Sequence, residues 1–324
     1  MNEFALIRTY FSAVGAPRGD VQLGVGDDCA LLRVPPGQQL AVSIDTLVAG
    51  VHFLPDGDPE ALGHKCLAVG LSDLAAMGAE PAWATLALTL PATLPQDSPD
   101  WIPAFARGFG NLAAAHGVAL VGGDTTRGPL SITVQVHGLV PDGDGVRRGG
   151  ARPGDLICVS GTLGDAGLAL RQLLAGGEPG PVLRARLERP TPRVALGLAL
   201  RGLASAMIDC SDGMAADLGH ILEASGVGAE LDLAALPLDG AVAAAVARTG
   251  DWGLPLASGD DYELCCCLPA EYRERLPELA AHGGCTLSTI GRILATPGLV
   301  CRAPDGSRVD LQRPGFDHFA TETD

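Results

Sequence analysis

Hydrophobic positions recur along the chain at two spacings, one typical of helices and the other of strands. Phe4, Ile7, Phe11 and Val14 lie three or four residues apart, which predicts a helix over residues 3–14. Elsewhere, short apolar runs end at glycine, proline or acidic residues, which is typical of strands in a folded sheet. Segments of both kinds alternate over the whole sequence and predict an α/β or α+β protein.

In the first half, the pattern predicts strands and helices in alternation. The strands are expected at residues 40–44, 82–90, 118–121 and 130–140, and the helices at 59–77 and 99–116. The first of these helices has a clear start, with Asp58 as N-cap and Pro59 at the first helical position, and Gly78 supplies its end.

The second half has the same alternation. Strands are expected at residues 155–160, 206–209, 229–233, 262–268, 286–294 and 298–302, and helices near 165–175, 193–204, 214–225, 239–248 and 270–281. A stretch rich in glycine, proline and aspartate over residues 141–154 separates the halves. We therefore expect two domains, residues 1–145 and 146–324, and no short-period repeat of the kind that forms solenoids.

The composition and net charge exclude several classes of function. The 324 residues include 22 Lys and Arg and 38 Asp and Glu, which gives a net charge of −16 with 47% hydrophobic residues. An acidic globular protein of this kind is expected to bind neither nucleic acid nor anionic membranes. Lys65 is the only lysine, and its sequence context fits neither a phosphate-binding G-x-x-x-x-G-K-[ST] loop nor the lysine motif of protein kinases.

The nine cysteines include no C-x-x-C pair, and most lie among apolar residues, including the run Cys265-Cys266-Cys267. They are expected to be reduced core residues rather than metal ligands, which favours the cytoplasm. We expect no secretory signal at the N-terminus and no membrane span, since no apolar run approaches the ~20 residues needed to cross a bilayer.

The main chemical signal is a set of acidic residues in glycine-rich or strand-end settings. They are Asp27, Asp28, Asp45, Asp73, Asp124, Asp209, Asp212, Asp260, Asp261 and Glu263. Several follow an apolar strand, so they are predicted to lie at the carboxyl edge of a sheet, where α/β proteins bind ligands. Converging carboxylates repel unless cations intervene, and oxygen ligands without neighbouring His or Cys suit Mg²⁺.

Each acidic residue also has a simpler interpretation as a turn former or helix cap. Asp217 and Asp232 are interpreted as solvated or locally hydrogen-bonded, and Asp73 is either a ligand or a solvent-exposed helix residue. The loop over residues 161–167 lies between a strand and a helix. Its amides fit a phosphate site, but an ordinary strand-to-helix turn explains it equally well.

Basic residues near the acidic motifs are open to two interpretations as well. Arg127 follows the acidic motif that contains Asp124, and Arg147 and Arg148 lie by the domain junction. An arginine beside a metal–phosphate centre neutralises phosphate oxygens, whereas a surface charge explains Arg148 equally well. His52 alone is more simply a packed or surface histidine.

Taken in order, these motifs resemble those of the thiamine-monophosphate kinase family. The resemblance rests on residues 24–30, 45–53, 71–79, 122–128, 208–213, 261–264 and 315–319 and covers nearly the whole chain. The wider superfamily includes aminoimidazole-ribonucleotide synthetase, selenophosphate synthetase and hydrogenase-maturation proteins.

The resemblance implies direct transfer of the γ-phosphoryl group of ATP to thiamine phosphate, with several Mg²⁺ ions. It implies a homodimer in which the N-terminal domains, each a mixed sheet with helices, close a barrel of strands near the ATP. A C-terminal α/β sandwich domain would close over the substrate. The resemblance further implies Mg²⁺ ligands at Asp28, Ser43, Ile44, Asp45, Asp73, Asp124, Asp209 and Asp212, ATP contacts at Gly123, Arg148 and Ser211, and thiamine phosphate contacts at His52, Asp260 and Phe316.

Two positions depart from the family pattern. Asp260 stands where the family often has Glu, and Ile44, which offers a metal only its backbone carbonyl, stands where a hydroxyl residue is common. Other ATP-using members of the superfamily are alternatives, although a selenophosphate synthetase would need a reactive Cys in an N-terminal segment and the first here is Cys29. A non-catalytic nucleotide- or cation-binding protein and a metal-dependent phosphohydrolase are further alternatives.

Overall fold

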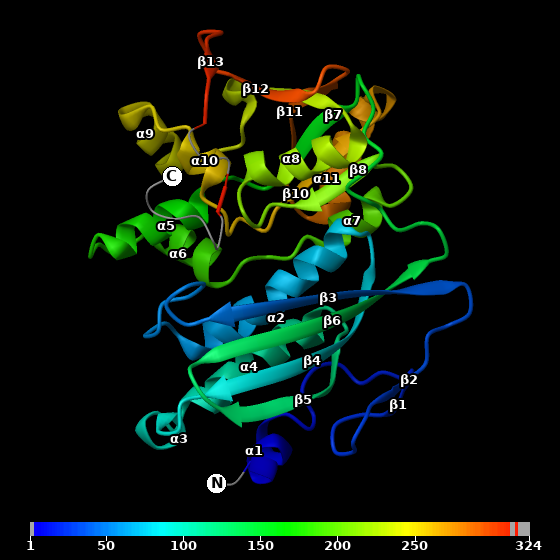
Figure 1. Cartoon of the computed structure of the whole chain (residues 1–324), viewed down its shortest axis with the longest axis vertical. Coiled ribbons are helices and arrows are strands. Elements are labelled where there is room, and N and C mark those ends of the chain that lie inside the picture. The colour runs from blue at the N-terminus through cyan, green and yellow to red at the C-terminus, as the bar shows by residue number, and fades with distance from the viewer. Residues whose placement is uncertain (1–2, 312–314, 317–324) are drawn as a thin grey trace. The chain divides into compact units, whose positions relative to one another are not determined.

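The computed structural model describes residues 3–311 and 315–316, and the chain forms two compact units (Figure 1). Unit 1 comprises the residues up to 74 together with 79–143, and unit 2 comprises residues 75–78 together with the chain from 144 onward. Each unit has a sheet of its own with helices packed against it, so the expected α/β class is confirmed.

Unit 1 is built on a four-stranded mixed sheet. Its strand order is β3 (Gln38–Val48), β6 (Ser131–Pro141), β4 (Glu80–Leu90) and β5 (Ala119–Arg127). β6 is antiparallel to both β3 and β4, whereas β4 and β5 are parallel. A parallel pair needs a crossover connection, and the chain between β4 and β5 supplies one with two helices.

The helices of unit 1 are α1 (Glu3–Tyr10), α2 (Pro59–Ala76), α3 (Leu94–Asp97) and α4 (Trp101–Ala115), and a small hairpin pairs β1 (Val21–Leu23) with β2 (Leu31–Leu32). α2 and α4 approach so closely that a Cβ atom on Gly108 would lie 1.8 Å from the carbonyl oxygen of Glu60. α2 also packs on the sheet, since a Cβ on Gly70 would lie 2.9 Å from Val136.

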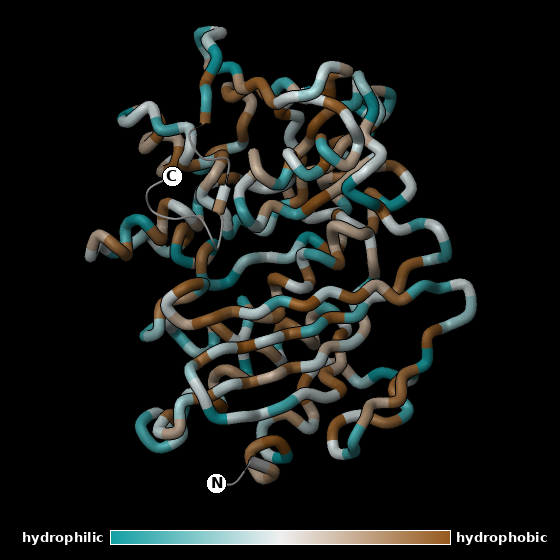
Figure 2. Tube along the Cα trace, viewed as in Figure 1, coloured by the Kyte–Doolittle hydropathy of each residue, from teal (hydrophilic) through white to brown (hydrophobic). Residues whose placement is uncertain are grey.

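The two faces of this sheet differ in character. Ile132, Val134 and Val136 of β6 are fully buried on the face that α2 covers. Residues of β3 on the opposite face are exposed, and three of them are large and apolar: Leu40 at 45%, Val42 at 50% and Ile44 at 61%. The alternation along the strands can be followed in Figure 2. Unit 1 therefore presents an open sheet face with apolar side chains on it.

Unit 2 contains a seven-stranded sheet. Its order is β13 (Arg308–Val309), β12 (Gly298–Arg302), β9 (Gly228–Asp232), β11 (Leu287–Leu294), β7 (Leu156–Ser160), β10 (Leu264–Leu268) and β8 (Ala206–Asp209). Only the β12–β9 pair is parallel. β10 thus lies between β7 and β8, although both precede it in the sequence.

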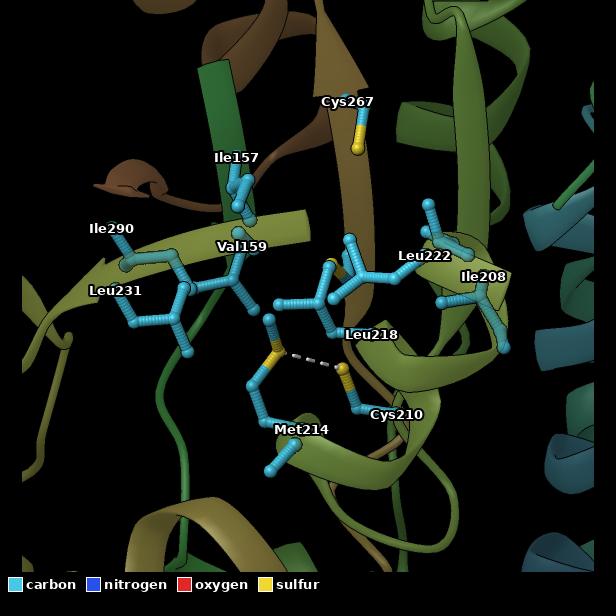
Figure 3. Close-up of a cluster of buried hydrophobic side chains, with 14 of the residues drawn as sticks. Ile157, Val159, Ile208, Cys210, Met214, Leu218, Leu222, Leu231, Cys267 and Ile290 are labelled. Carbon is cyan, nitrogen blue, oxygen red and sulfur yellow. Dashed lines mark hydrogen bonds between the residues drawn. The ribbon is translucent and has the colours of Figure 1, made fainter. Parts of the chain in front are cut away.

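Helices and short 3-10 turns complete unit 2. They are α5 (Asp165–Leu174), α6 (Pro181–Glu188), α7 (Val194–Leu200), α8 (Met214–Ser225), η1 (Leu233–Ala235), α9 (Gly240–Thr249), α10 (Gly253–Ala257), η2 (Ala270–Arg275) and α11 (Leu276–Gly283). Met214 and Leu218 of α8 pack against Ile157, Val159 and Ile208 of the sheet in one buried apolar cluster (Figure 3). This packing fixes the start of α8 at the end of β8.

Comparison with the sequence expectations gives both agreement and correction. The strands at 206–209 and 298–302 and the helix at 214–225 have the predicted bounds. The expected strand ends at residues 44 and 121 were wrong, because β3 continues to Val48 and β5 to Arg127. Asp45 and Asp124 therefore lie inside strands rather than beyond their ends.

Other expectations were incomplete. The pattern did not predict α6 or the β1–β2 hairpin, and the first helix ends at Tyr10 rather than near residue 14. Both β1 and β2 are only two or three residues long, too short to show an alternating pattern.

All nine cysteines are free thiols, and most are buried. Cys158 of β7 lies opposite Cys266 of β10 in the antiparallel register. The expectation of reduced core thiols is thus consistent with their positions.

Within residues 3–311 and 315–316, no helix combines the length and the apolar character needed to cross a bilayer.

Candidate functional site

Three candidate residues of unit 1 meet between β3 and α2. Ser43 and Asp45 are two residues apart on β3 and share the face covered by α2, and Asp73 lies on α2 itself. The Ser43 hydroxyl donates a short hydrogen bond to Asp73 Oδ2. Ile44 lies between Ser43 and Asp45 and faces the opposite side, so only its backbone is available to this group.

The Asp45 carboxylate is held in a setting that disfavours its charge. Burial, followed by the charge and hydrogen bond of Asp73, raises the pKa of Asp45 to about 7. Among the described residues, no hydrogen-bond donor reaches the buried Asp45 Oδ2. Two adjacent carboxylates and an unsatisfied buried oxygen are the donor set that a hard divalent cation satisfies, so these residues fit Mg²⁺.

A second group of unit 1 lines a pocket of about 440 Å³ at the β5 edge of the sheet. Phe4 and other residues of α1 form an apolar part of its wall, and Asp28 and Asp124 are among its acidic residues. Gly123 also lines it, and a Cβ there would lie 1.9 Å from the Leu86 carbonyl oxygen. Only glycine fits at this position, because any side chain would collide with the backbone of β4.

These two groups are separate within one chain. Asp45 lies on β3 and Asp124 on β5, the two outer strands of the sheet, and three strand spacings correspond to roughly 14 Å. Asp45 is in register with Gly123, whereas Asp124 is in register with Thr46 in the next row. Because successive rows face opposite sides, Asp45 points toward α2 and Asp124 away from it. A single chain therefore does not bring both carboxylates to one ion.

His52 lies in the turn after β3. Its Nδ1 accepts a hydrogen bond from the Val48 amide at 3.0 Å, which fixes the ring at the end of the strand. Since Nδ1 is the acceptor, a neutral imidazole carries its proton on Nε2. His52 thus has a structural contact at the end of β3.

In unit 2, candidate residues from three segments come together. The Asp260 amide donates to the Ser211 carbonyl at 2.8 Å, and the Phe316 amide donates to the Asp212 carbonyl at 2.9 Å. Phe316 keeps 51% of its surface exposed. Residues 317–319 of the last sequence motif lie outside the described residues. Asp209 ends β8 immediately before this group.

The backbone at Asp260 is unusual. Asp260 and Tyr262 both have positive φ, 62° and 49°, which non-glycine residues adopt infrequently. The Tyr262 hydroxyl donates to Asp260 Oδ1 at 3.0 Å. Such conformations persist only where the surroundings impose them, and they concentrate at functional sites.

Asp217 supports the neighbouring loop. It is buried, and its Oδ2 accepts hydrogen bonds from the amides of Asp212 and Gly213, each at 3.1 Å. Burial, and next the charge of Asp212, raise the pKa of Asp217 to about 7. The interpretation of Asp217 as a local hydrogen-bonding group is confirmed, although it is not solvated.

Arg148 lies near the start of β8 rather than at its end, since the carbonyl of the preceding Arg147 accepts the Met207 amide at 3.0 Å. Its carbonyl accepts a hydrogen bond from the Ser225 hydroxyl at the last residue of α8, whereas Ser211 precedes the first residue of that helix. A helix of 12 residues is roughly 18 Å long. The contacts of unit 2 therefore do not bring the Arg148 and Ser211 backbones together.

Asp261 and Glu263 are buried and have protein partners rather than free carboxylates. Both oxygens of Asp261 lie 3.0 Å from the Gly164 amide, and burial raises the pKa of Asp261. Glu263 accepts hydrogen bonds of 2.6 Å from both Arg186 and Arg193. Sequence reasoning missed the two arginines, because residues 184–193 hold four arginines and the local pattern does not separate buried ones from surface charges.

The loop at residues 161–167 has several contacts within the protein. The amides of Gly161, Leu163 and Gly164 all donate to protein acceptors. A phosphate at this helix start would use the amides of the first turn, residues 165–167, so the phosphate-binding and plain-turn interpretations both stay predictions.

Within the described part of the chain, no group of three or more His, Cys, Asp or Glu side chains is arranged to hold a metal ion. The candidate ligands thus occur in pairs, together with hydroxyl and backbone oxygens. Mg²⁺ commonly keeps water and substrate phosphates in its shell, so one or two carboxylates suffice for each ion.

Comparison with known proteins matches both units. The family model described as AIR synthase related protein, N-terminal domain, matches residues 26–140, and that described as AIR synthase related protein, C-terminal domain, matches residues 152–303. A thiamine-monophosphate kinase from Escherichia coli (strain K12) is 49% identical over 324 residues, covering 98% of each chain.

Solved structures give the same result. The crystal structure of a thiamine-monophosphate kinase from Stenotrophomonas maltophilia K279a is 48% identical, with a TM-score of 0.83 over 90% of this chain and 93% of that one. AaThiL complexed with AMPPCP and TMP is 31% identical, with a TM-score of 0.77 over 89% of each chain.

Proposed function

Since the chain belongs to the AIR synthase related family and, within it, to the thiamine-monophosphate kinases, we propose that it transfers the γ-phosphoryl group of ATP to thiamine phosphate. The observation that carries this function is 49% identity with a kinase of that name along essentially its whole length. The similar structure with AMPPCP, an ATP analogue, and TMP supports the same pair of substrates. The products are ADP and thiamine diphosphate.

Mg²⁺ is proposed as the metal. The ligands proposed in unit 1 are Asp28, Ser43, the Ile44 backbone, Asp45, Asp73 and Asp124, and those in unit 2 are Asp209 and Asp212. The strongest support is the Asp45–Asp73 pair with its unsatisfied buried oxygen. Bound Mg²⁺ would neutralise phosphate charge where two polyanions meet.

The protein's own task is then to bind and align. Gly123, Arg148 and Ser211 are proposed to contact ATP, and His52, Asp260 and Phe316 to contact thiamine phosphate. The attacking group is a phosphate oxygen that is already anionic, so the residues need not supply a strong general base. Rate enhancement would come from in-line positioning of the two substrates. The domain bounds 1–145 and 146–324, with their assigned roles, are part of this proposal.

A homodimer is proposed from unit 1. Its open sheet face exposes Leu40, Val42 and Ile44, and a second copy of the chain would bury them. A dimer would also shorten the distance between the strands that carry Asp45 and Asp124. In a closed barrel of two sheets, the β3 edge of one copy adjoins the β5 edge of the other. Asp45 of one chain and Asp124 of its partner would then lie on neighbouring strands, so that one ATP with its ions, rather than a single ion, would contact both.

Subunit complementation tests this arrangement. Asp45→Asn and Asp124→Asn homodimers are each expected to be nearly inactive. After unfolding and refolding an equimolar mixture, half of the dimers are mixed and each holds one intact site, so about a quarter of wild-type activity is expected. A mixture as inactive as its components would show that each site is made by one chain. Refolded wild type alone is the control for recovery.

The enzyme is proposed to act in the cytoplasm, because nine free thiols are stable in a reducing compartment. The function is tested by incubating the protein with ATP, thiamine phosphate and MgCl₂ and separating the products. Thiamine diphosphate and ADP in equal amounts are expected, with none after chelation by EDTA. Free phosphate without thiamine diphosphate would instead identify a phosphohydrolase, and ATP binding without turnover a non-catalytic protein.

A further inference from the structure

The segment that carries Asp260 alternates between exposed and buried side chains. Asp260 and Tyr262 are half-buried, whereas Asp261 and Glu263 are 2% and 0% exposed. Two residues therefore keep part of their surface accessible, and the two that alternate with them anchor the segment in unit 2.

Glu263 is the deeper anchor. Its carboxylate accepts hydrogen bonds from both the Nε and the Nη2 of Arg193, from Nη2 of Arg186 and from the Ser160 hydroxyl. A Cβ on Gly161 would lie 2.1 Å from this carboxylate, so the surrounding space is full. A carboxylate held from several directions in a dry site has one position.

The backbone of Glu263 extends this anchoring to the candidate ligand groups. Its carbonyl accepts the Cys210 amide at 2.7 Å, and the Tyr262 amide donates to the Cys210 carbonyl at 2.8 Å. The next contact in this series joins Asp260 to Ser211. The position of Glu263 thus determines where Asp260 lies and how the strained turn between them is held.

We propose that Glu263, clamped by Arg186 and Arg193, is a positioning residue for the acceptor substrate, acting through Asp260 without touching the substrate. The inference rests on the proposed function, since it assumes that Asp260 contacts thiamine phosphate. Its consequence is that acceptor affinity depends on a buried charge cluster that lies beneath the binding residues.

Steady-state kinetics of Glu263→Gln test the proposal, with each substrate varied at saturation of the other. Glutamine retains the shape but removes the charge that orients both arginines. KM for thiamine phosphate is expected to rise on the order of tenfold, because small misplacements of a binding group are costly. KM for ATP is expected to rise less, because Ser211, a proposed ATP contact that is joined to Asp260, follows β8, which pairs with β10 independently of the Glu263 side chain. Arg184→Gln is the matched control, because Arg184 is on the same helix as Arg186 and its ion pairs are at the surface.

A purely structural role predicts a different result. Loss of folded protein lowers the apparent kcat and leaves both KM values unchanged, and that result, or an equal rise in both KM values, would overturn the proposal. If Glu263→Gln fails to fold, Arg193→Lys is used as the test variant. Lysine keeps the positive charge but has one side-chain nitrogen, so it cannot reproduce the paired hydrogen bonds from Nε and Nη2. A thiamine phosphate KM equal to that of wild type in Arg193→Lys would also overturn it.

A double-mutant cycle identifies the route of action. In an Asp260→Ala background, Glu263→Gln is expected to leave the KM for thiamine phosphate unchanged, because the group that it positions is gone. Additive effects would overturn the proposal. Wild-type protein that makes no thiamine diphosphate would instead refute the proposed function, so the two failures are distinct.

Discussion

Asp45→Asn is expected to lower kcat by on the order of a hundredfold or more while the protein keeps its fold. Asparagine has the shape of aspartate but no charge, so the β3–α2 contact remains while the proposed cation loses an anionic ligand. Of the proposed ligands, Asp45 is expected to be the one whose substitution lowers kcat most. It lies beside Asp73, and among the described residues no hydrogen-bond donor reaches Asp45 Oδ2. Initial rates at saturating ATP, thiamine phosphate and Mg²⁺ measure the effect.

Asp58→Asn is the matched control for this substitution. Asp58 is also an aspartate of unit 1, but its carboxylate accepts the amides of Glu60 and Ala61 as the N-cap of α2. Asparagine is an equally good N-cap, so kcat is expected to stay within about twofold of wild type. Comparable rates for Asp45→Asn and Asp58→Asn would remove Asp45 from the metal site.

The same Asp45→Asn substitution is expected to stabilise the metal-free protein at alkaline pH. Folding raises the pKa of Asp45 from 3.8 to about 7, so the folded state binds this proton more tightly than the unfolded state does. The contribution of Asp45 to the free energy of unfolding is therefore fully present below pH 4 and is lost as the pH rises toward 7. Above pH 7, Asp45→Asn is expected to raise the free energy of unfolding by about 4 kcal/mol, since one pKa unit corresponds to about 1.4 kcal/mol.

Urea unfolding in EDTA at pH 4.5 and pH 8 measures this difference. The variant and the wild type are expected to have similar midpoints at pH 4.5 and to diverge at pH 8, where added MgCl₂ should stabilise only the wild type. A variant less stable than wild type at pH 8 would show that the Asp45 charge stabilises the fold. A loss of activity combined with a gain of stability is the pattern expected of a site selected for function.

The sequence predicted the fold class and most elements because their apolar periodicity is strong, as in the helix at residues 214–225. It failed at the ends of β3 and β5. Glycine and aspartate at residues 122–124 are unfavourable in strands, yet pairing with β4 keeps the segment extended through Arg127. Tertiary pairing, which no local pattern records, decided these ends.

The sequence motifs also identified candidate site residues but could not show which of them are buried or paired. Acidic motifs led to Asp45, Asp73 and Asp260, which the structure places beside other candidates. Chemistry alone could not separate Asp260 from Glu263, because both are carboxylates in one short motif. The full burial of Glu263 and its contacts with Arg186 and Arg193 separate this anchoring carboxylate from the half-buried Asp260.

The strand order of unit 2 has a consequence for synthesis on the ribosome. The sheet of unit 1 is complete once residue 141 has emerged, whereas β7 and β8 must wait for β10, which begins at Leu264. Until then, two apolar strands have unpaired edges and Cys158 lacks its neighbour Cys266. The nascent second half is therefore exposed to aggregation and to premature oxidation until β10 has been synthesised and pairs with both strands.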